Sequence, residues 1–278
     1  MNKKKVLAAF IALIMVFAVL SGCEGQRTPV VYNLYYSKDD DFLIGVAAAA
    51  IESTVEIRAE VSGSNYAGSG VIVATSSSKT FIITNNHVVC GSSGTTPGTV
   101  YVYAAGAEHT VLTRQKADVL WALKDDMDKK GDLALISVSK KSSHAAATYS
   151  VEELSFGQHI LAVGNALDYG TSVCDGIISN PSLKLDEKKY NYEGNVIQIT
   201  APINSGNSGG GLFDMKARLI GINTFKATAQ SPDDKEQRVF AEGISFSIRM
   251  SDVKDFVDRY NAKNPSNYVT LVPPPAEE

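Results

Sequence analysis

Between residues 55 and 84 the chain reads Val55-Glu56-Ile57-Arg58-Ala59, then Gly68-Ser69-Gly70-Val71-Ile72-Val73, then Phe81-Ile82-Ile83-Thr84. Each run is shorter than a typical helix, and the first alternates between apolar and charged side chains. Runs of this length that are rich in Val, Ile and Thr and separated by turn residues are typical of β-strands. This part of the chain is therefore predicted to form consecutive strands.

The same pattern continues over most of the remaining chain. The further short runs are Val100–Tyr103, Asp132–Val138, His159–Val163, Gly176–Ile178, Val196–Thr200 and Leu219–Thr224. A helical period appears only near the end, over Ser251–Tyr260, where Val253, Phe256 and Val257 share one face. About a dozen strands over some 210 residues fit two packed antiparallel barrels. The pattern predicts an all-β fold with a C-terminal α-helix, and by itself it indicates no function.

The N-terminus resembles the signal sequence of an exported lipoprotein. Three lysines, Lys3 to Lys5, precede an apolar run from Val6 to Leu20, which is shorter than the roughly 20 residues that span a bilayer. The run ends in Leu20-Ser21-Gly22-Cys23, which is similar to the lipobox of bacterial lipoproteins. The resemblance implies that residues 1–22 are removed and that the Cys23 thiol carries a lipid that holds the protein on a membrane. The alternative is an ordinary secretory signal with a chance cysteine.

Composition narrows the class of partner. The net charge is −4 and no stretch is strongly basic, so a nucleic-acid partner is not expected. Hydrophobic residues make up 44% of the chain, enough for a globular core. Cys90 and Cys174 are the cysteines left after Cys23, and they are equally compatible with a disulfide outside the cytoplasm and with two free thiols.

Three short segments supply the parts that serine-based acyl transfer requires. That chemistry needs a hydroxyl nucleophile, an imidazole base, a carboxylate that orients the imidazole, and backbone N–H groups aimed at the oxyanion. The candidates are Thr84-Asn85-Asn86-His87-Val88-Val89, Gly131-Asp132-Leu133-Ala134-Leu135-Ile136 and Gly206-Asn207-Ser208-Gly209-Gly210-Gly211. Taken singly, these segments also fit a structural histidine, a turn aspartate and a glycine-rich turn. Their order along the chain, His then Asp then Ser, is the order of the chymotrypsin class.

Seven blocks in order resemble the HtrA/Deg branch of the trypsin-like serine proteases, and the resemblance extends from about Val46 to Tyr260. The blocks begin at Gly68, Ile83, Gly131, Ala162, Ile203, Leu219 and Glu242. The resemblance implies a chymotrypsin-like fold of two packed antiparallel six-stranded β-barrels. It also implies a serine protease domain over residues 46–262, with the boundary between the barrels near residues 145–155. Residues 23–45 would then be a lipidated tether, and residues 263–278 a flexible tail.

The same resemblance assigns a role to each candidate residue. Ser208 would be the nucleophile, His87 the general base and then acid, and Asp132 the residue that orients His87. The backbone N–H groups of Gly206 and Ser208 would form the oxyanion hole. Asn207 stands where trypsin-like zymogens hold an aspartate for a newly cut amino terminus, so activation of that kind is not expected.

The substrate pocket is predicted from the same alignment. It would include Ile203, Gly221, Ile222 and Asn223, and Pro202 stands where a trypsin-type enzyme holds an aspartate. A small or apolar P1 side chain is therefore expected, and a Lys or Arg preference is not. The chain ends soon after its helix, so the PDZ domain that is usual in the HtrA family is not expected in this sequence. No metal and no cofactor are expected.

The sequence therefore predicts an extracytoplasmic, membrane-anchored serine endopeptidase, at the cell surface or in the periplasm, that cleaves unfolded or exposed polypeptides. HtrA relatives are often trimers built through N-terminal aromatic residues, and Tyr32, Tyr35 and Tyr36 are compatible with such a homo-oligomer. Two alternatives stay open. One is a catalytically quiescent chaperone or binding lipoprotein on the same fold, and the other is an esterase that uses the same site.

Overall fold

The structure is a computed structural model, and the part of the chain from Asp40 onward forms one compact unit. The residues that it describes are 40–91, 94, 96–104, 115–122, 131–139, 145–185, 192, 194–230 and 238–275. The predicted signal peptide and most of the predicted tether, with Cys23 and the three tyrosines, lie outside the described residues. Within the described part, no helix has both the length and the apolar character needed to cross a membrane.

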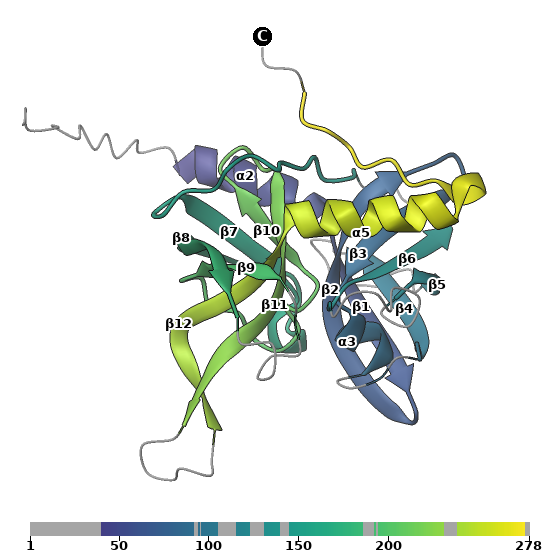
Figure 1. Cartoon of the computed structure of the whole chain (residues 1–278), viewed down its shortest axis with the longest axis horizontal. Coiled ribbons are helices and arrows are strands. Elements are labelled where there is room, and N and C mark those ends of the chain that lie inside the picture. The colour runs from purple at the N-terminus through teal and green to yellow at the C-terminus, as the bar shows by residue number, and fades with distance from the viewer. Residues whose placement is uncertain are drawn as a thin grey trace, which may run out of the picture. The chain divides into compact units, whose positions relative to one another are not determined.

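The first half of the chain forms a closed antiparallel barrel (Figure 1). Its strands follow one another around the barrel in the order β1-β2-β3-β6-β5-β4. Their bounds are β1 (Thr54–Val61), β2 (Ser64–Thr75), β3 (Lys79–Thr84), β4 (Thr99–Ala104), β5 (Gln115–Trp121) and β6 (Ala134–Ser139). The three runs between residues 55 and 84 thus lie in three neighbouring strands.

The second half forms another closed antiparallel barrel, with the order β10-β11-β12-β9-β8-β7. Its strands are β7 (His159–Gly164), β8 (Ser172–Lys184), β9 (Asn195–Ile199), β10 (Gly211–Asp214), β11 (Leu219–Gln230) and β12 (Arg238–Arg249). The predicted fold, two six-stranded antiparallel barrels and a C-terminal helix, is confirmed. The segment that connects the two barrels lies between β6 and β7.

Each barrel has its own apolar interior, and a third apolar cluster lies between the barrels. Strand β2 contributes to two of these cores: Ile72 points into the first barrel, whereas Val71 and Val73 belong to the cluster that also contains Leu161 and Val163 of β7. Successive side chains of a strand face opposite ways. The uninterrupted apolar run in β2 is therefore explained by burial of both faces of this strand.

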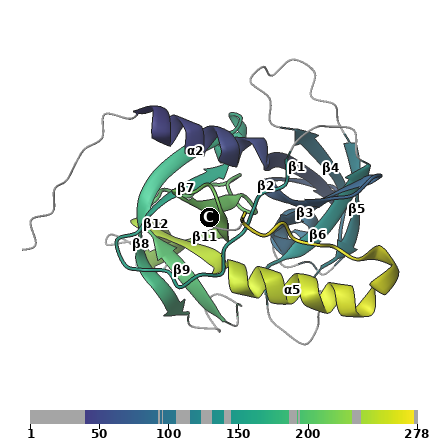
Figure 2. The same cartoon turned by 90° about the horizontal axis from the view of Figure 1, so that it is seen from above.

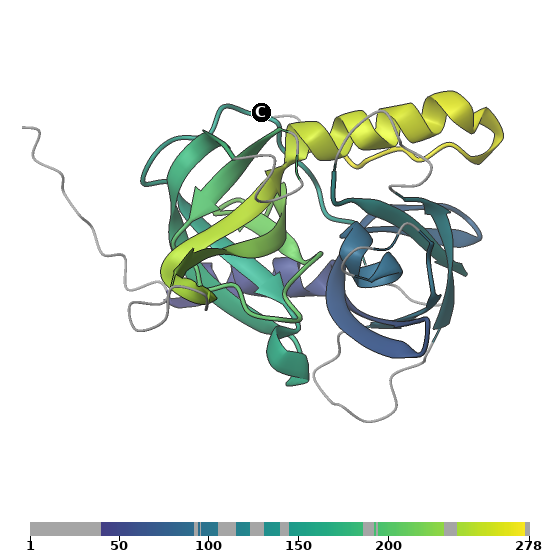
Figure 3. The same cartoon turned by 60° about the horizontal axis from the view of Figure 1, so that its bottom comes forward.

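Helix α5 (Met250–Lys263) leaves the end of β12 and reaches across to the first barrel (Figures 2 and 3). The rings of Tyr260 and of Trp121 in β5 form a T-shaped pair with 6.0 Å between centroids, and Lys263 lies over the same indole. The predicted helix over Ser251–Tyr260 is confirmed, and it extends by about one turn beyond Tyr260. The described residues also form α2 (Asp40–Glu52), α3 (Asn86–Cys90), and the short 3₁₀ turns η1 (Ala166–Asp168) and η2 (Pro265–Asn267).

Two predicted segments differ from what the structure shows. The predicted tether of residues 23–45 overlaps α2, whose Val46 and Ala50 are buried. The prediction of a flexible tail is wrong for residues 264–272. Val269 is buried, and its backbone N–H and C=O both bond to the Asn261 side chain, at 2.8 and 2.9 Å. The polar and proline-rich composition of this segment does not predict these specific contacts.

Cys90 and Cys174 are both free thiols. Cys90 is packed in the interior of the first barrel, whereas Cys174 lies on β8 of the second barrel. Burial, and then the nearby Asp175, raise the pKa of the Cys174 thiol. The structure thus corresponds to the free-thiol alternative.

Candidate active site

Asp132 holds His87 at two points. The first is a hydrogen bond from the His87 backbone N–H to Asp132 Oδ1, at 2.9 Å, and the second joins His87 Nδ1 to Asp132 Oδ2, at 2.7 Å. An ionised carboxylate only accepts hydrogen bonds, so Nδ1 is the protonated ring nitrogen and Nε2 is left as an acceptor. The Asn85 amide also donates to the Asp132 carbonyl, at 2.8 Å. These bonds fix the tautomer and the orientation of the imidazole.

Thr224, at a buried position of β11, connects this pair to Ser208. Its hydroxyl donates to Asp132 Oδ2 at 2.8 Å, and its carbonyl accepts the Ser208 hydroxyl at 2.9 Å. The structure thus brings His87, Asp132 and Ser208 together around one residue that the sequence analysis did not single out. Among the described residues, no hydrogen bond joins Ser208 directly to His87.

The backbone before Ser208 forms a tight turn. The Asn207 N–H donates to the Asn204 carbonyl at 3.0 Å, and Gly206, the third residue of the turn, has a φ of +95°. A positive φ at the third position is what type II turns require, and glycine adopts it without strain. A Cβ at Gly206 would lie 2.0 Å from the Asn165 carbonyl oxygen, so no other residue fits here.

This turn leaves two N–H groups available. The Ser205 carbonyl accepts from Leu167 N–H at 2.6 Å, and the Asn207 carbonyl accepts from Gly210 N–H at 3.0 Å. In a trans peptide the N–H points away from the C=O. The N–H groups of Gly206 and Ser208 therefore point away from these contacts. Neither has an acceptor within the part of the chain that the structure describes.

The pKa of His87 is raised above its ordinary value of 6.5. Burial lowers it, but the charge of Asp132 and the hydrogen bond to Asp132 together raise it by more. The protonated form is thus favoured by the fold. This contribution to stability is fully present below pH 6.5 and is lost as the pH rises through the raised pKa.

The four residues that were predicted to line a substrate pocket are all buried: Ile203, Gly221, Ile222 and Asn223. Ile222 packs in the cluster between the barrels, and the Asn223 side chain bonds to the Gly211 carbonyl and to the Ser247 hydroxyl. In this conformation neither Ile222 nor Asn223 has a surface that a substrate side chain can reach. The pocket assignment stays a prediction.

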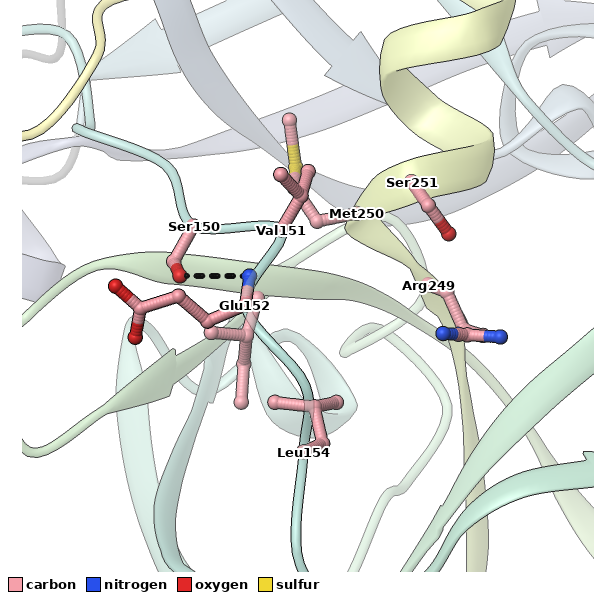
Figure 4. Close-up of a pocket in the computed structure, with 8 residues that line it drawn as sticks. Ser150, Val151, Glu152, Leu154, Arg249, Met250 and Ser251 are labelled. Atoms are coloured by element: carbon pink, nitrogen blue, oxygen red, sulfur yellow. Dashed lines mark hydrogen bonds between the residues drawn. The ribbon is translucent and has the colours of Figure 1, made fainter.

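A small concavity lies elsewhere, beside the N-terminus of α5 (Figure 4). It is lined by Ser150, Val151, Glu152, Leu154, Ile220, Arg249, Met250 and Ser251. None of these residues belongs to the predicted site. Glu152 is held by a bidentate ion pair with Arg218, at 2.7 and 2.8 Å, and therefore does not project a free carboxylate into the hollow.

Sequence reasoning missed Thr224 and Ser69. Ser69 is fully buried in β2, and its hydroxyl and backbone bond to segments on both sides of the site. Both residues stand inside quoted runs, Leu219–Thr224 and Gly68–Val73, as hydroxyl residues in runs that are mostly apolar or glycine. A polar residue at a position that the strand pattern buries is the signal that could have marked them.

Comparisons with known proteins show which proteins this chain is similar to. Serine protease Do-like HtrA of Lactobacillus helveticus is 32% identical over 250 residues, which are 89% of this chain and 52% of that protein. Serine protease Do-like HtrB of Bacillus subtilis is 34% identical over 196 residues, 69% of this chain and 38% of that protein. The solved structure of an HtrA-type protease, AlgW with tripeptide, has a TM-score of 0.62 at 25% identity, and the match covers 80% of this chain and 64% of that one.

The chain thus spans about half, or less, of the length of these curated relatives. The family model for the trypsin-like peptidase domain matches residues 68–222, from β2 of the first barrel to β11 of the second. Because that match covers more than half of the sequence, the chain belongs to the trypsin-like peptidase family.

Proposed function

We propose that this protein is a serine endopeptidase that acts outside the cytoplasm on unfolded or exposed polypeptides and is held on a membrane by a lipid on Cys23. The observation that carries the proposal is that Thr224 bonds to both Asp132 and the Ser208 hydroxyl and so links three features. These are the His87–Asp132 pair at 2.7 Å, the Ser208 hydroxyl, and the two available N–H groups of Gly206 and Ser208.

The roles follow from the chemistry of the groups. Ser208 Oγ attacks the scissile carbonyl while His87 Nε2 takes its proton and then gives it to the leaving amine. Asp132 stabilises the imidazolium that forms. The N–H groups of Gly206 and Ser208 bind the oxyanion. Before the attack the Ser208 hydroxyl leaves the Thr224 carbonyl for His87.

The substrate class rests on the similarity to serine proteases. The relatives carry that name, and the related HtrA-type protease AlgW was solved with a tripeptide. We propose polypeptide substrates with a small or apolar P1 residue, because Pro202 and the apolar Ile203 precede the Ser208 turn. No charged side chain precedes Ser208 within this segment that would favour a Lys or Arg at P1.

The location rests on the N-terminal sequence. We propose residues 1–22 as a signal peptide, Cys23 as the lipidated residue, and the stretch up to α2 as the tether. A relative of this chain from Haemophilus influenzae is named a probable periplasmic serine protease, which supports export. Mass spectrometry of the membrane-extracted protein tests this. The expected N-terminal peptide begins at Cys23 and carries the mass of an attached diacylglycerol.

A fluorophosphonate tests the catalytic assignment. The full-length chain, extracted in mild detergent, is treated with the probe, digested and analysed by mass spectrometry. We expect one adduct, on the peptide that contains Ser208, and parallel loss of casein hydrolysis. The heat-denatured chain is the control and should not react, because the serine is activated only in the folded site. Casein hydrolysis without an adduct on Ser208 would contradict the assignment.

The binding-module alternative would give a different result. A chain that neither reacts with the probe nor hydrolyses casein, but still prevents aggregation of an unfolded polypeptide, would be a catalytically quiescent chaperone. The Gly206 and Ser208 N–H groups have no acceptor among the described residues, which favours the peptidase over this alternative.

The midpoint of the acid limb in the pH profile of kcat/KM should lie above pH 6.5. The base must be neutral to accept a proton, and the pKa of His87 is raised by Asp132. We expect kcat/KM to fall tenfold per pH unit below that pKa, and half of the maximum to be reached at a pH above 6.5. Steady-state kinetics between pH 5 and pH 9 measure this. A profile that stays flat to below pH 6 would exclude His87 as the base.

A further inference from the structure

Ser69 of β2 bonds to three other segments at the site, and none of these hydrogen bonds goes to the His87 side chain or to the Ser208 hydroxyl. It is fully buried, with an exposed fraction of 0%. Its backbone N–H donates to the Ser208 carbonyl at 2.8 Å, and its own carbonyl accepts the Thr84 hydroxyl at 2.6 Å. Its hydroxyl donates to the Gly206 carbonyl at 2.7 Å and accepts the Asn165 backbone N–H at 2.8 Å. Each hydrogen-bonding group of Ser69 is thus engaged.

Among the contacts of the described residues, a side chain holds just one of the three consecutive carbonyls of this turn, that of Gly206. Leu167 N–H binds the Ser205 carbonyl and Gly210 N–H binds the Asn207 carbonyl, so both of these contacts are made by backbone. The Gly206–Asn207 peptide is fixed at its C=O by the Ser69 hydroxyl and at its N–H by the Asn204 carbonyl. This peptide lies between the two N–H groups proposed for the oxyanion, and its orientation sets the direction of both.

Ser69 also fixes the segment that holds the preceding peptide. By accepting Asn165 N–H it positions the start of the loop that carries Leu167. Leu167 has a φ of +54°, a conformation that non-glycine residues adopt only where the surroundings impose it. The Ser69 hydroxyl therefore orients two peptides. It holds the Gly206–Asn207 peptide directly, and it holds the Ser205–Gly206 peptide through the loop that carries Leu167.

Loss of this hydroxyl would remove the side-chain donor that the buried Gly206 carbonyl has in this structure. Buried backbone groups rarely stay unpaired, so the turn would relax toward conformations that pair them again. Gly206 has no Cβ and allows its flanking peptides to rotate at little cost. Rotation of either peptide turns a proposed oxyanion donor away from the site.

We infer that Ser69 is a positioning residue of the peptidase: from the first barrel it sets the oxyanion-binding peptides of the second barrel. The inference rests on the proposed function, since it concerns the same reaction. Ser69 makes the activity of the site depend on the packing of the two barrels. Strand β2 and the Ser208 turn must lie next to each other for the Ser69 hydroxyl to reach the Gly206 carbonyl.

The test is Ser69→Ala in the full chain, with kcat expressed per active site titrated by a fluorophosphonate. We expect kcat to fall about 10- to 100-fold, less than the loss of a whole oxyanion donor. KM should change less than about threefold, because Ser69 has no contact with substrate in the proposed reaction. A destabilised but otherwise normal enzyme would show fewer titratable sites and an unchanged kcat per site.

A peptide aldehyde gives a second readout. Ser208 Oγ adds to its carbonyl carbon, the C=O π bond breaks, and the resulting oxygen occupies the oxyanion position while the serine proton passes to His87. We expect the inhibition constant to rise in Ser69→Ala by the same factor as kcat/KM falls. An unchanged inhibition constant would overturn the inference.

The matched control is Ser137→Ala. Ser137 is a buried serine of β6 in the same barrel, and its hydroxyl has no hydrogen-bond partner among the described residues. This variant should keep the wild-type kcat. Ser69→Cys, which keeps a weak donor of similar size, should give an intermediate kcat and serves if the alanine variant does not fold.

The outcomes distinguish failure of the proposed function from failure of the role assigned to Ser69. A wild-type chain that neither hydrolyses polypeptide nor reacts with the probe overturns the proposed function and the role of Ser69 together. An active wild type, with Ser69→Ala or Ser69→Cys at full kcat per site, overturns only the role of Ser69.

Discussion

Ser208→Ala is expected to lower kcat for polypeptide hydrolysis on the order of 10⁶-fold, with the fold intact. The change removes the nucleophile, so His87 has no hydroxyl to deprotonate. The N–H groups of Gly206 and Ser208 remain and should support a residual rate about 10³- to 10⁴-fold above that in water. Among the described residues the Ser208 side chain makes a single hydrogen bond, to the Thr224 carbonyl, so its loss should shift the unfolding midpoint little.

The measurement is hydrolysis of a fluorogenic peptide, with urea unfolding of each variant. Ser155→Ala is the matched control, because Ser155 is an exposed serine of the linker between the barrels and should keep full activity. Ser208→Ala should still bind an unfolded polypeptide, because the rest of its site is unchanged. Retained hydrolysis in Ser208→Ala would assign the reaction to a different nucleophile and would contradict the triad.

The two barrels were predictable because strand length, composition and turn residues are local properties. Val55–Ala59 alternates, and in the structure its apolar side chains face inward. The continuous run Val71-Ile72-Val73 indicated burial without indicating its cause. Only the packed structure shows that Ile72 belongs to one core and its two neighbours to another.

The order and chemistry of the site were also readable from sequence, whereas its internal contacts were not. Thr224 reaches Asp132 across 92 positions, and Ser69 reaches Gly206 across 137. No local period encodes such pairs, because they arise only when the two barrels close on each other. Resemblance to a family supplied the three main residues, and geometry was needed for those that hold them.

The pocket prediction shows a different limit. Ile222 and Asn223 were assigned by resemblance along a strand, where neighbouring side chains face opposite ways. In the structure Asn223 is fully buried and bonded to Gly211 and Ser247. The residue types alone did not reveal these contacts, and the pocket assignment stays a prediction.

Asp132→Asn is expected to lower kcat about 10⁴-fold while the chain still folds. Asp132 accepts hydrogen bonds from the His87 backbone, His87 Nδ1 and the Thr224 hydroxyl. An amide has only one oxygen for these donors. If that oxygen takes the His87 backbone N–H, the amide NH₂ faces Nδ1 and can only donate to it. The imidazole then carries its proton on Nε2 and cannot accept the proton of Ser208.

The same substitution should lower the pKa of His87. Burial lowers this pKa in the wild type, and the charge of Asp132 and its hydrogen bond outweigh that effect. With the charge removed, burial remains, so the pKa should fall below the ordinary value of 6.5. NMR of ¹⁵N-labelled imidazole measures both the pKa and the tautomer, independently of any substrate.

Asp118→Asn is the matched control, because Asp118 is an exposed aspartate of β5 in the same barrel and its loss should change neither kcat nor the His87 resonances. The kinetic and spectroscopic results test different steps of the mechanism. A variant that loses activity but keeps its Nδ1-protonated tautomer would show that Asp132 acts through the charge of the imidazolium and not through orientation. A variant with wild-type kcat and a shifted His87 pKa would show that Asp132 takes no part in the reaction, although Asp132 would remain the partner of His87.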